Sequence, residues 1–149
     1  MKIKDYLEEI EKERKVIIRP ANSEHGEITV CISTYTLKVP AETMYNRKLL
    51  DKIIKKYAKN PVVDVKIACH STLLITCTSK TERRGNDIFD AEKGVKIAVA
   101  KNNTKVCKAA CDILVTIFND LINRCKNLTY KVEKIKNCYL REVKYLDKI

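Results

Sequence analysis

The side chains best suited to chemistry in this sequence are arginines that could bind an anion. Arg83 and Arg84 are adjacent in the polar segment SKTERRGND, and Asp87 follows three residues later. A guanidinium group presents N–H donors in a planar fork that matches a phosphate, whereas lysine acts as a point charge. Two arginines on a turn before a helix would form an anion clamp; the alternative is a solvated hairpin. The predicted ligand-binding residues are Arg83, Arg84, Arg19, Arg47, Arg124 and Asp87.

Patterns typical of catalytic and metal sites do not occur in the sequence. The sequence has only two histidines, His25 and His70. It contains no nucleophile elbow, no glycine-rich phosphate loop and no HExxH motif. Cys107 and Cys111 lie four residues apart, but structural zinc sites usually carry two close pairs of CxxC type. We therefore predict a protein that is not an enzyme and that uses no metal and no cofactor.

The overall composition predicts a single soluble domain over residues 1–149. Hydrophobic residues make up 45% and charged residues 33% of the chain, which suits a globular protein rather than a disordered one. No apolar run approaches the roughly 20 residues that span a bilayer, and the first residues form a charged pattern unlike a signal peptide. We expect no membrane contact and a cytoplasmic location. Seven scattered cysteines are then expected to be reduced and buried.

A net charge of +11 indicates an anionic partner. Three kinds of partner fit this charge: a nucleotide, a nucleic acid, or an acidic face of another protein. The alternative interpretation is an ordinary lysine-rich surface. Seven tyrosines could stack on bases, but no recognisable nucleic-acid-binding module accompanies them. Charge alone therefore supports only nonspecific binding to nucleic acid.

The first half of the chain predicts helices and strands in alternation. Apolar residues at helical spacing predict a helix over residues 2–15. EITVCISTYTLKV alternates like a strand, with a change of phase near Ser33 that predicts a bulge or a turn. NRKLLDKIIKKYAKN carries its apolar residues on one helical face. Two further strands are predicted within PVVDVKIACHSTLLITCTSK.

The second half of the chain predicts helices. Asp90 is a good N-cap, and Gly94 inside the helix that follows indicates a close approach of another backbone. The polar run Asn102-Asn103-Thr104 predicts a break and a new helix start. The long helix near residues 104–126 has an apolar face wide enough to fill the core or to pack against a second subunit. The tail, with residues such as Val132 and Ile135 at spacings of three and four, predicts another helix.

Together these elements predict an α+β fold, in which a small antiparallel sheet packs against several helices. The long apolar core helix near residues 104–126 predicts a homo-oligomer.

The segment STLLITCTSKTERRGNDIFDAEKGVKIAVAKN resembles a family of small proteins that is widespread in phages and prophages of Gram-positive bacteria. The motif that carries the resemblance is D-x-F-D-x-x-x-G-x-x-x-A, formed here by Asp87, Phe89, Asp90, Gly94 and Ala98. At the level of the fold pattern the chain is also similar to Thoeris-type anti-defence sponges, which sequester cyclic ADP-ribose-type signal nucleotides without cleaving them.

This resemblance implies a phage-encoded, non-enzymatic counter-defence protein of the host-cell cytoplasm that sequesters an anionic nucleotide. Two alternatives remain at the level of the sequence. One is a protein that binds nucleic acid, or that inhibits a CRISPR-type nucleoprotein or another host defence protein. The other is a structural or assembly protein that uses the helical face.

Overall fold

A computed structural model describes residues 11–20, 26–68, 71–82 and 91–149 of the chain. The chain divides into two compact units, Met1–Leu114 and Val115–Ile149. The prediction of one domain over residues 1–149 stays a prediction, because a single helix runs through both units.

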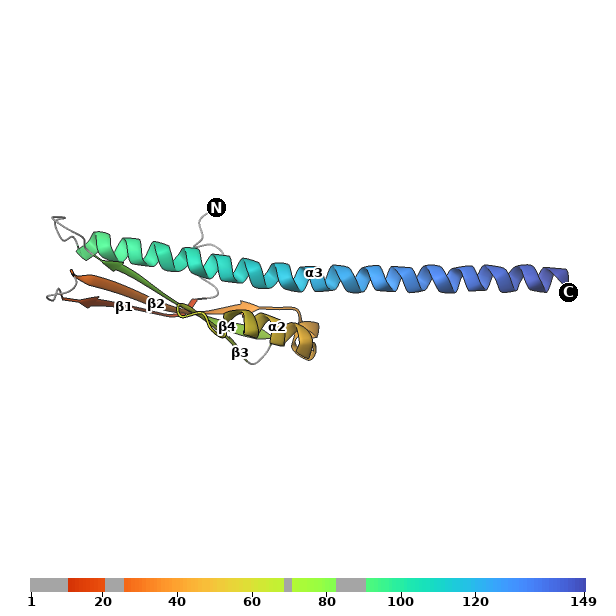
Figure 1. The fold of residues 1–149 in the computed structure, drawn as a ribbon, viewed down its shortest axis with the longest axis horizontal. Helices are drawn as coiled ribbons and strands as arrows, with labels where there is room; N and C mark the ends of the chain where they lie inside the picture. Colours follow the sequence, from red (N-terminus) through yellow and green to blue (C-terminus); the bar gives the residue numbers. More distant parts are fainter. Residues whose placement is uncertain (1–10, 21–25, 69–70, 83–90) are drawn as a thin grey trace. The chain divides into compact units, whose positions relative to one another are not determined.

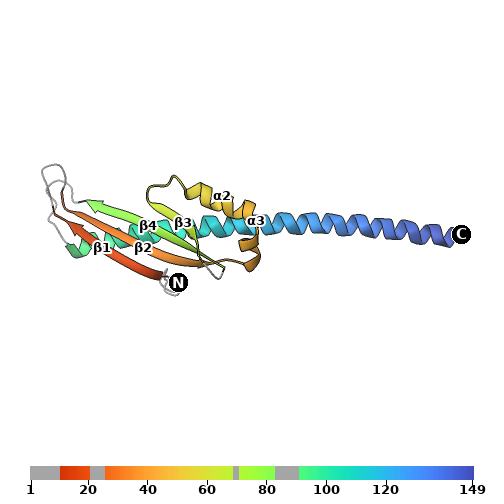
Figure 2. The ribbon, with the colours of Figure 1, turned by 90° about the horizontal axis from the view of Figure 1, so that it is seen from below.

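The first unit is built on a four-stranded antiparallel sheet. Its strands are β1 (Glu11–Arg19), β2 (Ile28–Lys38), β3 (Val63–Ile67) and β4 (Thr72–Glu82), in the spatial order β1-β2-β4-β3. Helix α3 (Ala91–Lys148) begins in this unit, and its first part lies along one face of the sheet (Figures 1 and 2). The predicted α+β class, with an antiparallel sheet and a long helix, is confirmed.

Two short elements connect β2 to β3: the 3-10 helix η1 (Ala41–Tyr45) and helix α2 (Arg47–Tyr57). The Asn46 side chain caps α2 by accepting a hydrogen bond of 3.2 Å from the backbone N–H of Leu49. Leu49, Leu50, Ile53 and Tyr57 are buried on one face. The helix predicted from NRKLLDKIIKKYAKN is thus confirmed, and so are the two strands predicted after it.

The helix predicted over residues 2–15 is wrong where the structure describes that segment. Residues 11–15 belong to β1, and residues 1–10 lie outside the described residues. The physical reason is that Val16, Ile17 and Ile18 are β-branched and pair with β2. The charged residues before them belong to the same edge strand, and Glu13, Arg14 and Lys15 are exposed there, so the charge pattern of this segment did not indicate a helix.

The irregularity predicted near Ser33 does occur in the sheet, but in the neighbouring strand: the register of β1 against β2 shifts between Glu11 and Glu13, opposite Tyr35 and Thr34. Strand β2 itself has no bulge. The pairing of β2 with β4 runs without a shift from Ile28 opposite Glu82 to Lys38 opposite Thr72. The residues at odd positions of β2 are buried along its whole length, including the polar Thr29 and Ser33. The apparent change of phase arose because the small polar residues Thr29 and Ser33 occupy two of the five odd positions of β2.

Close packing of α3 explains why small polar residues occur on that face. A Cβ atom at Gly94 would lie 3.0 Å from Oγ1 of Thr29. One turn later, the Ser79 hydroxyl donates a hydrogen bond of 2.7 Å to the backbone carbonyl of Ala98. The close approach predicted at Gly94 is confirmed, although the neighbour is a side chain rather than a backbone.

The helix break predicted at Asn102-Asn103-Thr104 is wrong, because α3 continues through it. The fully buried Asn102 donates from Nδ2 to the carbonyl oxygens of Cys31 (3.1 Å) and Cys77 (2.9 Å). Asn103 accepts from the Tyr35 hydroxyl at 3.3 Å. These polar side chains therefore fasten the helix to the sheet instead of ending it. Asp90, the predicted N-cap, lies outside the described residues, and α3 begins at the next residue.

The described cysteines differ in burial, with Cys107 half-buried. Cys31 and Cys77 are buried between the sheet and α3, as predicted. Cys111, Cys125 and Cys138 are exposed, so the prediction of burial is wrong for these three. All three lie in α3 with their side chains exposed.

Candidate functional site

The arginines predicted to bind a ligand do not meet in one place in the described first unit. Arg19 ends β1 beside Ile28, the first residue of β2. Arg47 begins α2, which follows the last residue of β2 by way of η1. Both side chains are exposed. Arg19 lies beside the first residue of β2, whereas Arg47 follows its last residue along the chain, and the 11-residue strand between these ends is roughly 33 Å long at the usual rise per residue.

The remaining predicted site residues are divided between the second unit and the part of the chain that is not described. Arg124 lies in the second unit, where its Nε is 3.0 Å from Oδ2 of Asp120. Arg83, Arg84 and Asp87 lie outside the described residues. For all six residues the binding of a ligand stays a prediction.

Within the first unit, one stripe of α3 covers the sheet. Its buried residues recur at intervals of three or four: Ala98, Asn102, Val106, Ala109 and Ile113. This spacing keeps the residues on one face of a helix with 3.6 residues per turn. Packing of α3 against the sheet within the first unit therefore explains this stripe.

The second unit presents a different apolar stripe, which is exposed rather than buried in the described part of the chain. Its residues alternate strictly between intervals of three and four from residue 118 to residue 149. We call this stripe the seam. The seam residues are Phe118, Leu121, Cys125, Leu128, Val132, Ile135, Tyr139, Glu142, Leu146 and Ile149.

The seam is exposed along its length. Ile135 is 70% exposed, Tyr139 65% and Leu146 68%. Cys125 and Glu142 are exposed as well. Isolated apolar residues on a surface are ordinary, whereas a continuous line of them marks a site of interaction.

The spacing of the seam is that of a coiled coil. Apolar residues that alternate at three and four have a mean period of 3.5, and two such helices pack by winding around each other. Counting Phe118 as the first position of a seven-residue repeat, nine of the ten first and fourth positions are Phe, Leu, Val, Ile, Tyr or Cys. Glu142 is the exception. The positions farthest from the seam are Asn123, Tyr130, Asn137 and Lys144.

A hollow on the helix surface lies at the start of the seam. Phe118, Leu121, Ile122 and Cys125 contribute to its lining, and every lining residue comes from α3. These four positions are the ones that form a hole for a side chain of a facing helix in knobs-into-holes packing. The lining also includes Lys126, Thr129, Tyr130 and Glu133, so the hollow extends from the seam toward the opposite side of the helix.

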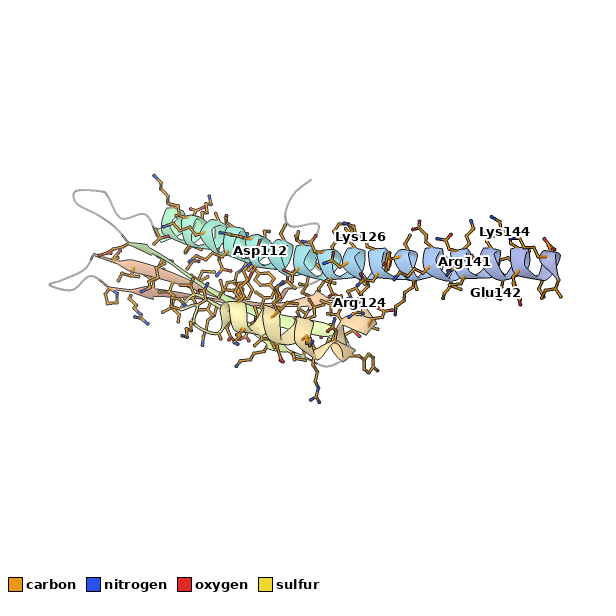
Figure 3. All side chains as sticks on the ribbon, turned by 45° about the vertical axis from the view of Figure 1, so that its right-hand side comes forward. Asp112, Arg124, Lys126, Arg141, Glu142 and Lys144 are labelled. Carbon is orange, nitrogen blue, oxygen red and sulfur yellow. The ribbon has the colours of Figure 1, made fainter. Side chains whose placement is uncertain are left out.

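Charges are distributed unevenly around the second unit. Residues 115–149 carry eight Lys or Arg and four Asp or Glu, a net charge of +4. In Figure 3, Arg124 and Glu142 project to one side of the helix, while Lys126 and Lys144 project to the other. A spacing of 18 residues is five full turns, which explains why the members of each pair share a side.

The sequence predicted two parts of the seam but not that they form one continuous stripe. The apolar face near residues 104–126 and the spacing of Val132, Ile135, Tyr139 and Leu146 were both recognised. The predicted break at residues 102–104 and the division into two helices concealed the uninterrupted repeat. The repeat becomes evident when the spacing of apolar residues is followed through all five repeats of residues 118–149, rather than within each predicted helix.

Comparison with protein-family models, curated proteins and solved structures finds no match for this chain. The resemblance to the phage family therefore stays a prediction. In the described segments, no helix has both the length and the apolar character needed to cross a bilayer. Nor do three His, Cys, Asp or Glu side chains in those segments gather into a possible metal site.

Proposed function

We propose that this protein is a non-enzymatic assembly protein, in which the seam of α3 joins copies of the chain. The observation that carries the proposal is the strict alternation of three and four over residues 118–149, all on an exposed face. A helix in a globular protein is stabilised mainly by packing of its apolar face. The second unit contains no other element on which this face could pack, so a further helix is the natural cover.

Self-association also suits the composition of the surface around the seam. The far side of the helix is polar, with Asn, Lys and Tyr at the positions opposite the apolar line. This division into one apolar and one polar side is the pattern of a helix that is covered on one side only. In the assembly, each copy brings one α+β first unit, so the binding surfaces of that unit are multiplied.

Cysteine alkylation tests the proposal in the unmodified protein. Cys125 lies in the seam, whereas Cys111 is exposed in the first unit. We expect iodoacetamide to modify Cys125 at least tenfold more slowly at high protein concentration than at low concentration, while the rate at Cys111 stays constant. Mass spectrometry of the peptides gives both rates. Equal rates at Cys125 across the concentration range would contradict self-association through the seam.

Cys77 supplies an internal control for the same experiment. Burial raises the pKa of its thiol to about 11, against an opposing effect of Lys105. Because the thiolate is the form that reacts with iodoacetamide, Cys77 stays unmodified at neutral pH at every protein concentration. Its modification would report unfolding rather than dissociation.

The second candidate function is the sequestering of an anionic nucleotide by a phage-encoded counter-defence protein, with nucleic acid or a host defence protein as the alternative partner. The net charge of +11 favours it. Arg19 and Arg47, both exposed, would each offer a guanidinium group to an anion at a separate place on the first unit. Mass spectrometry of the denatured protein, purified from cells with an active nucleotide-signalling defence, tests this candidate. A stoichiometric nucleotide is expected, and release of nucleic acid or of nothing would overturn it.

A further inference from the structure

We infer that the seam binds one second copy of the same segment in the antiparallel direction, with Phe118 opposite the second copy's Ile149. The inference rests on the proposed self-association and adds the identity, direction and register of the partner. Three observations carry it: the self-matching of the seam, the position of Glu142, and the charges on both sides of the seam.

The seam matches itself when it is reversed. In an antiparallel coiled coil, first positions of the repeat face fourth positions of the other helix. Phe118, Cys125, Val132, Tyr139 and Leu146 hold the first positions, and the other five seam residues hold the fourth. One register uses all ten residues. In this register the residues of one copy face those of the other in five pairs: Phe118 and Ile149, Leu121 and Leu146, Cys125 and Glu142, Leu128 and Tyr139, and Val132 and Ile135.

Glu142 decides between the two directions. In a parallel, in-register pair every residue faces its own counterpart, so Glu142 would face Glu142 inside the contact. Two like charges without a partner there are strongly unfavourable. In the antiparallel register Glu142 faces Cys125, next to Arg124 of the second copy. Arg124 and Glu142 share one side of the helix (Figure 3), so both arginines and both glutamates come to the contact.

The charged residues that flank the seam also favour the antiparallel direction. A parallel pair would bring Lys131 of one copy close to Lys136 of the other, because these flanking positions meet in that direction. The antiparallel register instead joins Ile122 with Val143 and Thr129 with Lys136. On the other flank it joins Arg124 with Tyr145 and Lys131 with Cys138.

Neighbouring antiparallel registers are less favourable. A shift of one repeat in one direction places Lys131 against Lys131, and a shift in the other places Lys136 against Lys136. The first shift also places Phe118 opposite Glu142, and the second places Val132 there. In both cases Arg124 of the second copy no longer lies next to Glu142. The register with Cys125 opposite Glu142 is therefore the only one of the three without a pair of like charges.

The contact is also large enough for a stable dimer. Nine of the seam residues are apolar, and the exposed fractions of the large ones range from 37% for Leu121 to 83% for Ile149. If the ten residues lose on average about 80 Å² each, each copy buries about 800 Å², which is the size of a standard protein interface.

Disulfide trapping tests the direction and the register. The variant Glu142→Cys, made together with Cys111→Ser and Cys138→Ser, is equilibrated with oxidised and reduced glutathione. Mass spectrometry then identifies the linked peptides. We expect a covalent dimer with Cys125 linked to the new cysteine at position 142 in most of the protein. The matched control is Lys144→Cys in the same background, whose side chain lies on the far side of the helix and should give at least tenfold less cross-linking to Cys125.

The other outcomes separate failure of this inference from failure of the proposed function. Links from Cys125 to Cys125, and from position 142 to position 142, would overturn the antiparallel direction. A dimer in sedimentation velocity that forms no link through position 142 would overturn the register. A monomer at every concentration would overturn the proposed function itself.

Discussion

Replacing Ile135 with aspartate is expected to convert the protein into a monomer. Ile135 lies near the middle of the seam and is 70% exposed in the single chain, so the substitution does not disturb the core of either unit. In the antiparallel pair it faces Val132, and each dimer would bury two unpaired carboxylates. The cost of burying a charge without a partner is several kcal/mol. We expect the dissociation constant for self-association to rise at least 100-fold, as measured by size-exclusion chromatography with light scattering.

The matched control for this variant is Lys134→Asp. It introduces the same residue one position earlier, where the Lys134 ammonium lies 4.6 Å from the centre of the Tyr130 ring, outside the seam. It also lowers the intrinsic helix preference by a similar amount. The control is expected to keep the mass of the unmodified protein. If Ile135→Asp kept that mass as well, the seam would not be the contact.

Replacing Asn102 with alanine is expected to destabilise the first unit by about 2–4 kcal/mol. The buried amide of Asn102 donates to carbonyl groups on two neighbouring strands, β2 and β4. Its loss removes both hydrogen bonds and leaves a small cavity beneath α3, and each of these effects costs on the order of 1–2 kcal/mol. Urea unfolding followed by circular dichroism measures the change in the free energy of unfolding.

This measurement is best made in the Ile135→Asp background, so that self-association does not contribute to the apparent stability. Asn119→Ala serves as the control, because Asn119 is an exposed residue of the same helix. It should be neutral or slightly stabilising, since alanine is the better helix former. A change below 0.5 kcal/mol for Asn102→Ala would show that the two hydrogen bonds do not secure α3 to the sheet.

The elements that were predicted correctly are those in which local pattern and tertiary burial agree. Helix α2 has a single apolar face, an asparagine cap at Asn46 and a lysine-covered outer side, so its sequence is sufficient to define it. Strands β3 and β4 alternate in the same way. In these cases the side chains that face the core are also the apolar ones.

The errors occur where polar residues face the core. Thr29, Ser33 and Asn102 are all buried. Thr29 lies close to Gly94 of α3, and Asn102 donates from α3 to the carbonyl oxygens of Cys31 and Cys77. A periodicity based on apolar residues reads such positions as solvent-facing, which produced the false bulge in β2 and the false break in α3. The partner that satisfies each polar group lies some 70 residues away in the case of Asn102 and Cys31, and no local pattern contains that information.

The candidate site was predictable in part. A wide apolar face and a homo-oligomer were expected from residues 104–126, but the seam lies mainly beyond them. Its recognition depends on α3 being one helix, which in turn depends on the buried contacts of Asn102. The predicted arginine site depends on how distant segments are brought together, and Arg19 and Arg47 belong to opposite ends of β2.

The mass of the unmodified protein in solution is the most direct measurement of the central claim. Sedimentation equilibrium at several concentrations is expected to show twice the chain mass of 17.2 kDa, with dissociation only on dilution. The Ile135→Asp variant should sediment as a single chain under the same conditions. A mass of one chain at all concentrations for the unmodified protein would contradict the claim that the seam joins two copies.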